Sequence, residues 1–215
     1  MHFYGYFRSS SAYRCRIAFN LKGVEPEFTS VHLRRDGGEQ KKPDYTAMNP
    51  QALVPTLKAG DAVITQSLAI IEWLDETMPE PALLPADPVA KARVRAFAQI
   101  IACDIHPLQN LRVLEYLGEV YGADQAGKDA WCQRWLGDGL AACEALAAAQ
   151  THGGDFVFGT TPGLADICLV PQMFSATRFG VETSGFPTLE RIMAACSALP
   201  AFTDAAPCKQ PDAEA

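Results

Sequence analysis

Residues 3–23 read FYGYFRSSSAYRCRIAFNLKG, an apolar stretch followed by three serines and then by apolar residues at helical spacing. This pattern predicts a short strand over 2–7 and a helix over 11–22 that ends at Lys22-Gly23. The serines lie where the strand gives way to the helix, a place that offers hydroxyls, unpaired N–H groups and the positive end of a helix dipole. One serine is enough to cap a helix, so three serines after Arg8 indicate a site for an anion.

The remainder of the first 80 residues also mixes strand and helix patterns. Residues 28–33 alternate like a second strand, and residues 53–58 and 62–65 form a hairpin around a turn at 59–61. A helix over 66–77 closes the unit. The order is strand, helix, strand, and then strand, strand, helix, which is typical of a thioredoxin-like domain.

A cluster of prolines separates this region from the next. Four prolines lie between residues 79 and 88, and proline blocks helix formation. Beyond them, residues 89–149 and 164–178 are rich in alanine and leucine at helical spacing and show no strand pattern. Gly163 and Asp166 predict the start of the later helix, because an acid at the third helical position accepts from the amide of the capping residue.

These patterns predict an α/β plus all-α protein in two domains. We expect a thioredoxin-like domain over 1–80, a linker over 81–88, and an all-helical domain over 89–215. With 215 residues and 48% hydrophobic content, the chain is large enough for both cores.

The charge balance and the cysteines exclude several classes of protein. The net charge of −7 argues against nucleic-acid binding, which needs an excess of clustered Lys and Arg. The seven cysteines form no C-x-x-C pair, so neither a zinc site nor a thioredoxin redox motif is expected, and most of them should be buried. No secretory leader or run of about 18 apolar residues is present, which favours a cytoplasmic protein without a membrane span.

Two further dipeptides suit a peptide ligand. Val54-Pro55 leads the hairpin, and a cis proline there would turn the backbone of Val54 outward, where its N–H and C=O can pair with an extended peptide. A trans proline at the start of an edge strand is the alternative. Gln66-Ser67 opens the next helix, where a hydroxyl and the helix dipole suit a carboxylate.

The chain resembles the zeta-class glutathione transferases in six segments that together span its length. They are FRSSSAYRCRIA at 7–18, NPQALVPTL at 49–57, QSLAIIEWL at 66–74, HPLQNLRVL at 106–114, LADICLVPQ at 164–172 and PCKQPD at 207–212. The resemblance implies the glutathione transferase fold and glutathione as coenzyme. It also implies an isomerase of maleyl keto acids that acts in the breakdown of aromatic compounds.

The resemblance further assigns roles to single residues. It implies that Ser9, Ser10 and Ser11 surround the sulfur of glutathione, with Ser9 as the preferred hydroxyl donor. Ser11 stands where the family usually has cysteine. The residues implied to hold glutathione are Arg14, Gln40, Gln51, Val54, Pro55, Gln66, Ser67, His106, Asn110, Leu111 and Arg112.

The chemistry follows from the thiol. Hydroxyl donors and a helix N-terminus lower a thiol pKa from about 8.5, so that the thiolate exists at neutral pH. A thiolate that adds to a cis-enone allows rotation, and its elimination leaves the trans alkene. A diacid needs cationic anchors, and the candidates are Arg8, Arg112 and Arg178. Arg178 has an alternative role as the cation at a helix C-terminus, and His106 alone would be interpreted as a core histidine.

Several functions remain open at this point. The first is conversion of maleylacetoacetate to fumarylacetoacetate, and the second is the same reaction on maleylpyruvate. A general conjugating or dehalogenating transferase is the third, and a non-catalytic binding module would be expected to lose the serines. We also expect a homodimer formed through the apolar helical surface at 90–117.

Overall fold

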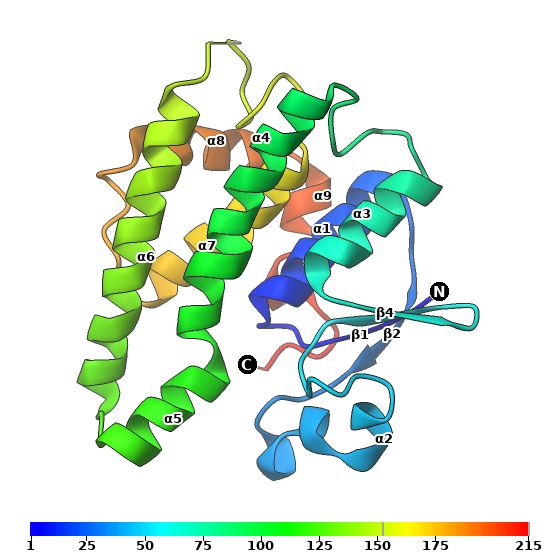
Figure 1. Cartoon of the computed structure of the whole chain (residues 1–215), viewed down its shortest axis with the longest axis vertical. Helices are drawn as coiled ribbons and strands as arrows, with labels where there is room; N and C mark the ends of the chain where they lie inside the picture. The colour runs from blue at the N-terminus through cyan, green and yellow to red at the C-terminus, as the bar shows by residue number, and fades with distance from the viewer. Residues whose placement is uncertain (152, 215) are drawn as a thin grey trace. The chain divides into compact units, whose positions relative to one another are not determined.

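The computed structural model describes residues 1–151 and 153–214 (Figure 1). The chain divides into two compact units, of which the first contains Met1–Leu83 and the C-terminal residues from Leu199 onward. The second unit is Leu84–Ala198. The helical domain expected over 89–215 therefore extends too far, because its last residues fold with the N-terminal unit.

The first unit is built on a four-stranded sheet. Its strands are β1 (His2–Gly5), β2 (Glu27–Ser30), β3 (Thr56–Ala59) and β4 (Ala62–Thr65), in the order β2-β1-β3-β4. β1 runs parallel to β2 and antiparallel to β3, and β4 runs antiparallel to β3. Leu57 of β3 lies opposite Phe3 and Ile64 and is completely buried. The thioredoxin-like order predicted from the sequence is confirmed.

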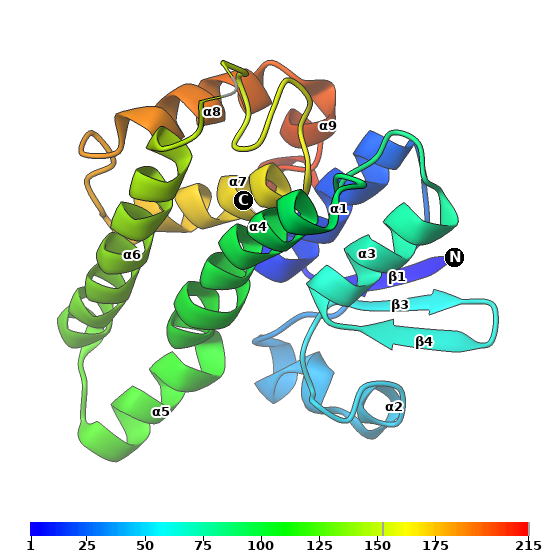
Figure 2. The ribbon, with the colours of Figure 1, turned by 45° about the horizontal axis from the view of Figure 1, so that its top comes forward.

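Two helices pack on one face of this sheet, α1 (Ser10–Lys22) and α3 (Ser67–Thr77) (Figure 2). α1 buries every residue from Ala12 to Phe19. It ends at Gly23, which has a φ of 64° and donates to the carbonyl of Asn20, as the Lys22-Gly23 signal predicts. A shorter helix, α2 (Pro43–Thr46), precedes β3.

The C-terminal segment is attached to α1 by hydrogen bonds from side chains to backbone carbonyls. It includes the short helix α9 (Pro200–Thr203), which lies beside α1 (Figure 1). The Tyr13 hydroxyl donates to the carbonyl of Phe202 at 3.4 Å, and Asn20 donates to that of Ala201 at 2.9 Å. These bonds are the physical reason that the segment folds with the first unit.

The second unit is helical. Its helices are α4 (Pro88–Gln99), α5 (Leu111–Tyr121), α6 (Gln125–Ala148), α7 (Leu164–Arg178) and α8 (Pro187–Ser197). A π-helical turn at Ile100–Ile105 and a 3₁₀ turn at His106–Gln109 connect α4 to α5. The described residues of this unit contain no strand, only one isolated bridge between Phe156 and Gly159.

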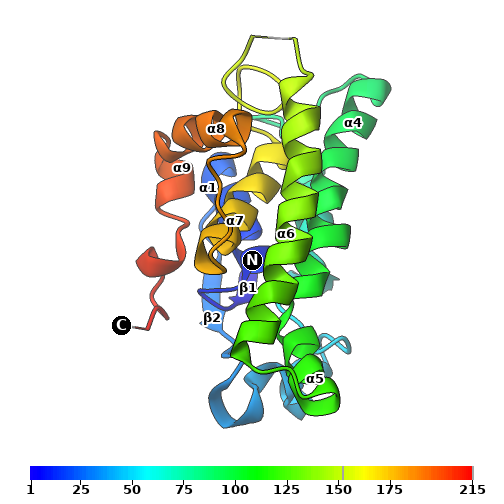
Figure 3. The same ribbon diagram turned by 90° about the vertical axis from the view of Figure 1, so that its left-hand side faces the viewer.

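α8 lies beside the C-terminal half of α6 (Figure 3), where Glu144 accepts from the backbone N–H groups of Thr188 and Leu189 at 3.0 and 2.9 Å. α7 is buried at every residue from Leu164 to Met173. At its start, the Asp166 carboxylate accepts from the N–H of Gly163 at 2.9 Å, which confirms the predicted helix start. None of the helices among the described residues is long and apolar enough to cross a membrane.

Candidate active site

The serine cluster forms a continuous chain of hydrogen bonds. Ser9 is the N-cap of α1, and its Oγ accepts from the N–H of Ala12 at 3.2 Å. The Oγ atoms of Ser9 and Ser11 are 3.1 Å apart, and Ser11 Oγ donates to the carbonyl of Val54 at 3.1 Å. A hydroxyl has one proton, and that of Ser11 is directed at Val54. Ser9 is therefore the donor to Ser11.

This chain makes Ser9 both a helix cap and an activated donor. The amide that donates to Ser9 Oγ polarises its O–H, and bonds in a chain strengthen one another. Ser9, Ser10 and Ser11 are all partly exposed, and Ser10 is the first residue of the 13-residue helix α1. The positive end of that helix therefore lies at hydroxyls that an anionic ligand can reach.

The backbone before β3 is held from behind by two buried side chains. The Tyr45 hydroxyl and the Asn49 amide each donate to the carbonyl of Leu53 at 2.7 Å. The Val54-Pro55 peptide is cis, the conformation that the sequence analysis favoured for a peptide-binding edge. Val54 is thus fixed on one side by its neighbours in the chain and on the other by Ser11.

A second polar site lies at the N-terminus of α3. Gln66 has a φ of 70°, a left-handed conformation that is unusual for a residue other than glycine, and its amide donates to the Gln51 side chain at 2.6 Å. Such backbone conformations cluster at ligand sites. Ser67 begins the helix, and its hydroxyl accepts from the guanidinium of Arg14 at 3.4 Å.

Arg14 contacts the Ser67 hydroxyl from the interior of the unit. Only 1% of its surface is exposed, so its charge lies behind the hydroxyl, beneath the start of α3. A buried guanidinium and a helix N-terminus both favour an anion at this place. Arg14, Gln51, Gln66 and Ser67, which the resemblance implied as ligands of glutathione, are linked in two hydrogen-bonded pairs.

The Gln40 side chain is buried rather than exposed to a ligand. Its amide nitrogen donates to the carbonyl of Leu33 at 3.2 Å. Gly38 approaches it so closely, with a φ of 105°, that a Cβ there would lie 2.6 Å from the Gln40 side chain. The predicted role of Gln40 as a ligand of glutathione remains a prediction.

Arg8 precedes the serines and is partly buried. Its guanidinium carbon lies 5.6 Å from the centre of the Phe7 ring. Burial raises the pKa of the neighbouring Tyr6 hydroxyl, and the charge of Arg8 opposes that rise. Arg8 is the sequence neighbour of Ser9, and its role as the anchor of a substrate carboxylate stays a prediction.

The remaining predicted residues belong to the second unit. Asn110 caps α5 and accepts from the N–H of Arg112 at 3.2 Å, while the Arg112 side chain is exposed. Arg178 lies in the last turn of α7, with its guanidinium carbon 4.6 Å from the centre of the Phe179 ring. That position agrees with the alternative role as a helix-terminal cation. The approach of His106, Asn110, Leu111, Arg112 and Arg178 to the serines of the first unit stays a prediction.

Two charged residues that hold the serine loop were not predicted from the sequence. Arg16 donates to the carbonyl of Phe7 at 2.9 Å and to that of Tyr6 at 3.5 Å, and Asp212 accepts from the N–H of Phe7 at 3.0 Å. Burial lowers the pKa of Arg16 to about 10, which leaves it charged at neutral pH. Both residues stand out in the sequence, because Arg16 interrupts an apolar helix and Asp212 ends the segment at 207–212. The sequence does not show which groups they bind.

Three of the buried cysteines are poorly suited to act as nucleophiles. Cys15 is completely buried in α1. In the second unit, burial raises the pKa of Cys132 to about 11 and that of Cys143 to about 12. The thiols of these three residues are shielded, and raised pKa values keep the latter two protonated, which disfavours them as nucleophiles. Cys103 and Cys208 are free and exposed.

Comparison with known proteins agrees with this description. Residues 8–77 match the family "Glutathione S-transferase, N-terminal domain". The chain is 50% identical to a maleylpyruvate isomerase of Ralstonia sp over 212 residues, which is 99% of each protein. It is also similar to the holo structure of maleylpyruvate isomerase, described as a bacterial zeta-class glutathione S-transferase, with a TM-score of 0.96, 50% identity and full coverage of both chains.

A third similar protein has a glutathione derivative bound in its active site. The structure of maleylacetoacetate isomerase from Anaeromyxobacter dehalogenans 2CP-1, with bound dicarboxyethyl glutathione and citrate in its active site, superposes with a TM-score of 0.86 at 39% identity. The alignment covers 99% of this chain and 93% of that one. Because half of its residues are identical to those of one such relative over almost the full length of both, this chain belongs to the zeta class of the glutathione transferases.

Proposed function

We propose that the protein is a glutathione-dependent cis–trans isomerase of maleyl keto acids, with maleylacetoacetate and maleylpyruvate as the candidate substrates. The observation that carries this proposal is the hydrogen-bonded chain from the amide of Ala12 through Ser9 and Ser11 to Val54. It sets two hydroxyls at the positive end of a helix, beside the backbone that leads into β3. That combination stabilises a thiolate that belongs to a peptide.

The first unit offers places for the γ-glutamyl and cysteinyl parts of glutathione. The N-terminus of α3, with Ser67 backed by Arg14, suits the γ-glutamyl carboxylate. The backbone of Val54 suits the cysteinyl residue, and Ser9 suits its sulfur. The relative from Anaeromyxobacter binds a glutathione that bears a diacid, which supports the same use of this site.

When bound, glutathione supplies a thiolate that adds reversibly to the cis alkene and so permits rotation about that bond. The chain's own residues have three tasks. Ser9 turns its polarised O–H from Ser11 Oγ to the sulfur and so favours the charged form. The dipole of α1 favours the same charge. Arg8 holds one carboxylate of the substrate beside the sulfur, with Arg178 or Arg112 assigned to the other.

The two candidate substrates share the reacting part. Each has a carboxylate, a cis alkene and a ketone, and they differ only in the chain beyond the enone. The serines and Arg8 would contact the part of the substrate that both acids share. We therefore propose the class of substrate rather than one of the two acids. Relative values of kcat/KM for the two acids will identify the physiological substrate.

Substoichiometric glutathione tests the proposal. Enzyme, maleylacetoacetate or maleylpyruvate, and a limiting amount of glutathione should give an amount of trans product far above the amount of thiol. S-methylglutathione, which has no free thiol, should support no turnover. If product formation stops once it equals the thiol added, glutathione is a consumed substrate and the isomerase proposal fails.

We also infer a homodimer in a reducing, cytoplasmic compartment. All seven cysteines are free, which suits a reducing environment. Helix α5 exposes an apolar face, with Tyr116, Val120 and Tyr121 between 54% and 73% exposed. Apolar side chains gathered on one helix face support burial against a second copy of the chain.

A further inference from the structure

The C-terminal tail is bound to the loop that carries the serines. The Asp212 Oδ2 atom accepts from the backbone N–H of Phe7 at 3.0 Å and from the hydroxyl of Ser30 at 2.7 Å. Phe7 follows β1, and Ser30 ends β2. One carboxylate oxygen therefore joins the ends of two parallel strands, two positions before Ser9.

Arg16 fixes the carbonyls of the same loop. Its guanidinium donates to the carbonyls of Tyr6 and Phe7, and its Nε donates to the carbonyl of Ala205 at 2.9 Å. The carbonyl of Tyr6 also accepts from the N–H of Ser9 at 3.0 Å, which closes a turn. The N–H of Phe7 and both carbonyls are thus held by side chains that come from α1 and from the tail.

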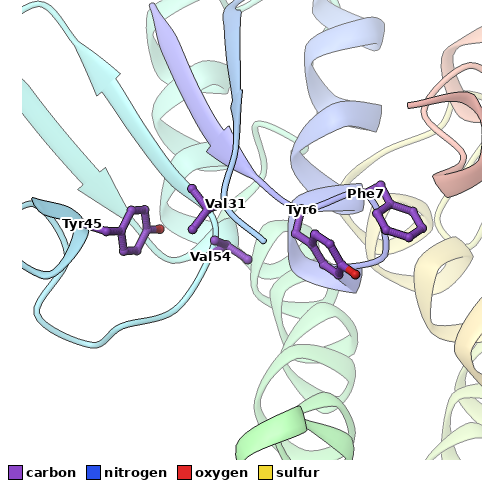
Figure 4. Packing of buried hydrophobic residues seen from close by; sticks show 5 residues of the cluster. All are labelled: Tyr6, Phe7, Val31, Tyr45 and Val54. Atoms are coloured by element: carbon purple, nitrogen blue, oxygen red, sulfur yellow. The ribbon is translucent and has the colours of Figure 1, made fainter. Parts of the chain in front are cut away.

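Apolar packing and a second carboxylate hold the tail in place. Ala213 packs against a cluster of five buried residues. The members of this cluster, shown in Figure 4, are Tyr6, Phe7, Val31, Tyr45 and Val54. Glu214 lies 2.7 Å from His32 Nε2, while His32 Nδ1 accepts from the N–H groups of Arg34 and Arg35. Since Nδ1 is an acceptor, Nε2 carries the proton and donates to Glu214. The tail is therefore attached on both sides of Ala213.

We propose that Asp212 is a positioning residue for the thiolate site, which acts through the N–H of Phe7 to set the place of Arg8 and Ser9. This inference rests on the proposed function, because the group to be positioned is the Ser9 hydroxyl that faces the glutathione sulfur. Displacement of a catalytic donor by about 1 Å is enough to cost catalysis severely. A loop held at its N–H and at two carbonyls has little freedom to make such a displacement.

A positioning role and a purely electrostatic role of Asp212 predict opposite shifts in the pKa of the bound thiol. A negative carboxylate near the site disfavours a thiolate, so removal of its charge alone would lower the pKa of the bound thiol. Loss of the acceptor for Phe7 releases the loop, weakens the Ser9 hydrogen bond and raises that pKa. An asparagine keeps an oxygen acceptor in the same place and loses only the charge.

The experiment titrates the thiol of glutathione bound to the full-length protein, by the ultraviolet absorbance of the thiolate, in Asp212→Ala, Asp212→Asn and the parent. Asp212→Ala should raise the pKa by about one unit, a roughly tenfold loss of thiolate below that pKa, and kcat should fall in parallel at neutral pH. Asp212→Asn should have a thiol pKa equal to that of the parent or slightly below it, because only the charge is lost. Glu214→Gln is the matched control, because it changes the other tail carboxylate and leaves the acceptor of Phe7 intact.

An unchanged or lowered pKa in Asp212→Ala overturns the proposal, as does an Asp212→Asn variant as impaired as the alanine variant. If Asp212→Ala does not fold, Ser30→Ala removes the other donor to the carboxylate and should shift the pKa upward by a smaller amount, whereas no shift refutes the proposal. The titration needs no diacid substrate, so it is independent of the isomerase activity. A protein that lowers the thiol pKa but isomerises neither maleylacetoacetate nor maleylpyruvate would refute the proposed function, and the titration would still test the role of Asp212.

Discussion

Ser11 and Val54 are 43 positions apart in the sequence, and the Ser11 hydroxyl donates to the Val54 carbonyl at 3.1 Å. This bond joins the helix that supplies the hydroxyls to the backbone edge that suits a peptide. Since its only proton is committed to Val54, Ser11 accepts from Ser9 rather than donating to it. The roles of the two serines are therefore unequal: the Ser9 proton is directed at another hydroxyl rather than at the backbone, so a bound thiolate can replace Ser11 Oγ as its acceptor.

Replacement of Ser9 by alanine should lower kcat by about 10²-fold or more, because a donor to a developing charge is lost. Ser11→Ala should lower it less. Steady-state kinetics at saturating glutathione measure both. A larger loss in Ser11→Ala would place the main donor at Ser11.

The capping role of Ser9 needs its own control. Loss of an N-cap costs about 1 kcal/mol, so Ser9→Ala should also unfold at a lower temperature. Ser9→Asn keeps a cap and lacks a hydroxyl, whereas Ser9→Thr keeps both. We expect the asparagine variant to be stable and impaired, and the threonine variant to retain activity; an active asparagine variant would show that only the cap matters.

Replacement of Ser67 by alanine should weaken glutathione binding and leave the chemistry largely intact. The hydroxyl lies in front of the Arg14 guanidinium, and a hydrogen bond to a charged group contributes about 1.5–3 kcal/mol, so Kd should rise roughly ten- to a hundredfold. Calorimetry gives Kd, and kcat at saturating glutathione serves as the control. A Kd equal to that of the parent would show that the γ-glutamyl carboxylate of glutathione does not bind at the start of α3.

Arg8→Met and Arg178→Met should each raise KM for the diacid by about ten- to a hundredfold if these residues bind its two carboxylates. Turnover of a neutral alkyl halide should hardly change, because thiol activation does not need them. An equal loss with both electrophiles would assign Arg8 to the thiol instead.

Arg178 has a separate alternative, since it lies at the end of α7 against Phe179. Thermal unfolding of Arg178→Met decides between the two roles. A variant with normal KM and reduced stability has lost a helix-terminal cation, and Arg112 then becomes the second anchor.

Light scattering at micromolar concentration should give a particle of about twice the chain mass of 23.3 kDa. If the apolar face of α5 is the interface, Tyr116→Lys combined with Val120→Lys should yield a folded monomer. Val63→Lys, at a position of β4 that is 43% exposed in the first unit, is the matched control and should remain dimeric. A parent of single-chain mass would refute the dimer.

Local patterns were sufficient for most of the fold. The apolar stretch of β1, the alternation over 28–33, the stop at Gly23 and the start of α7 at Asp166 each depend on residues within a few positions of one another. The strand and helix order then left few topologies to consider. The division into units failed at the tail, because helical spacing does not reveal which core a short C-terminal segment joins.

The sequence by itself determined the element order, the location of the serines at a helix start and, through the six segments, the family. Only the tertiary structure decided which serine caps α1, that Arg14 stands behind Ser67, and that the Asp212 carboxylate reaches Phe7 across 205 positions. The physical reason is the sequence separation of the residues that interact. Capping and periodicity are set by neighbours along the chain, whereas a hydrogen bond between distant segments exists only once the sheet and α1 have brought them together.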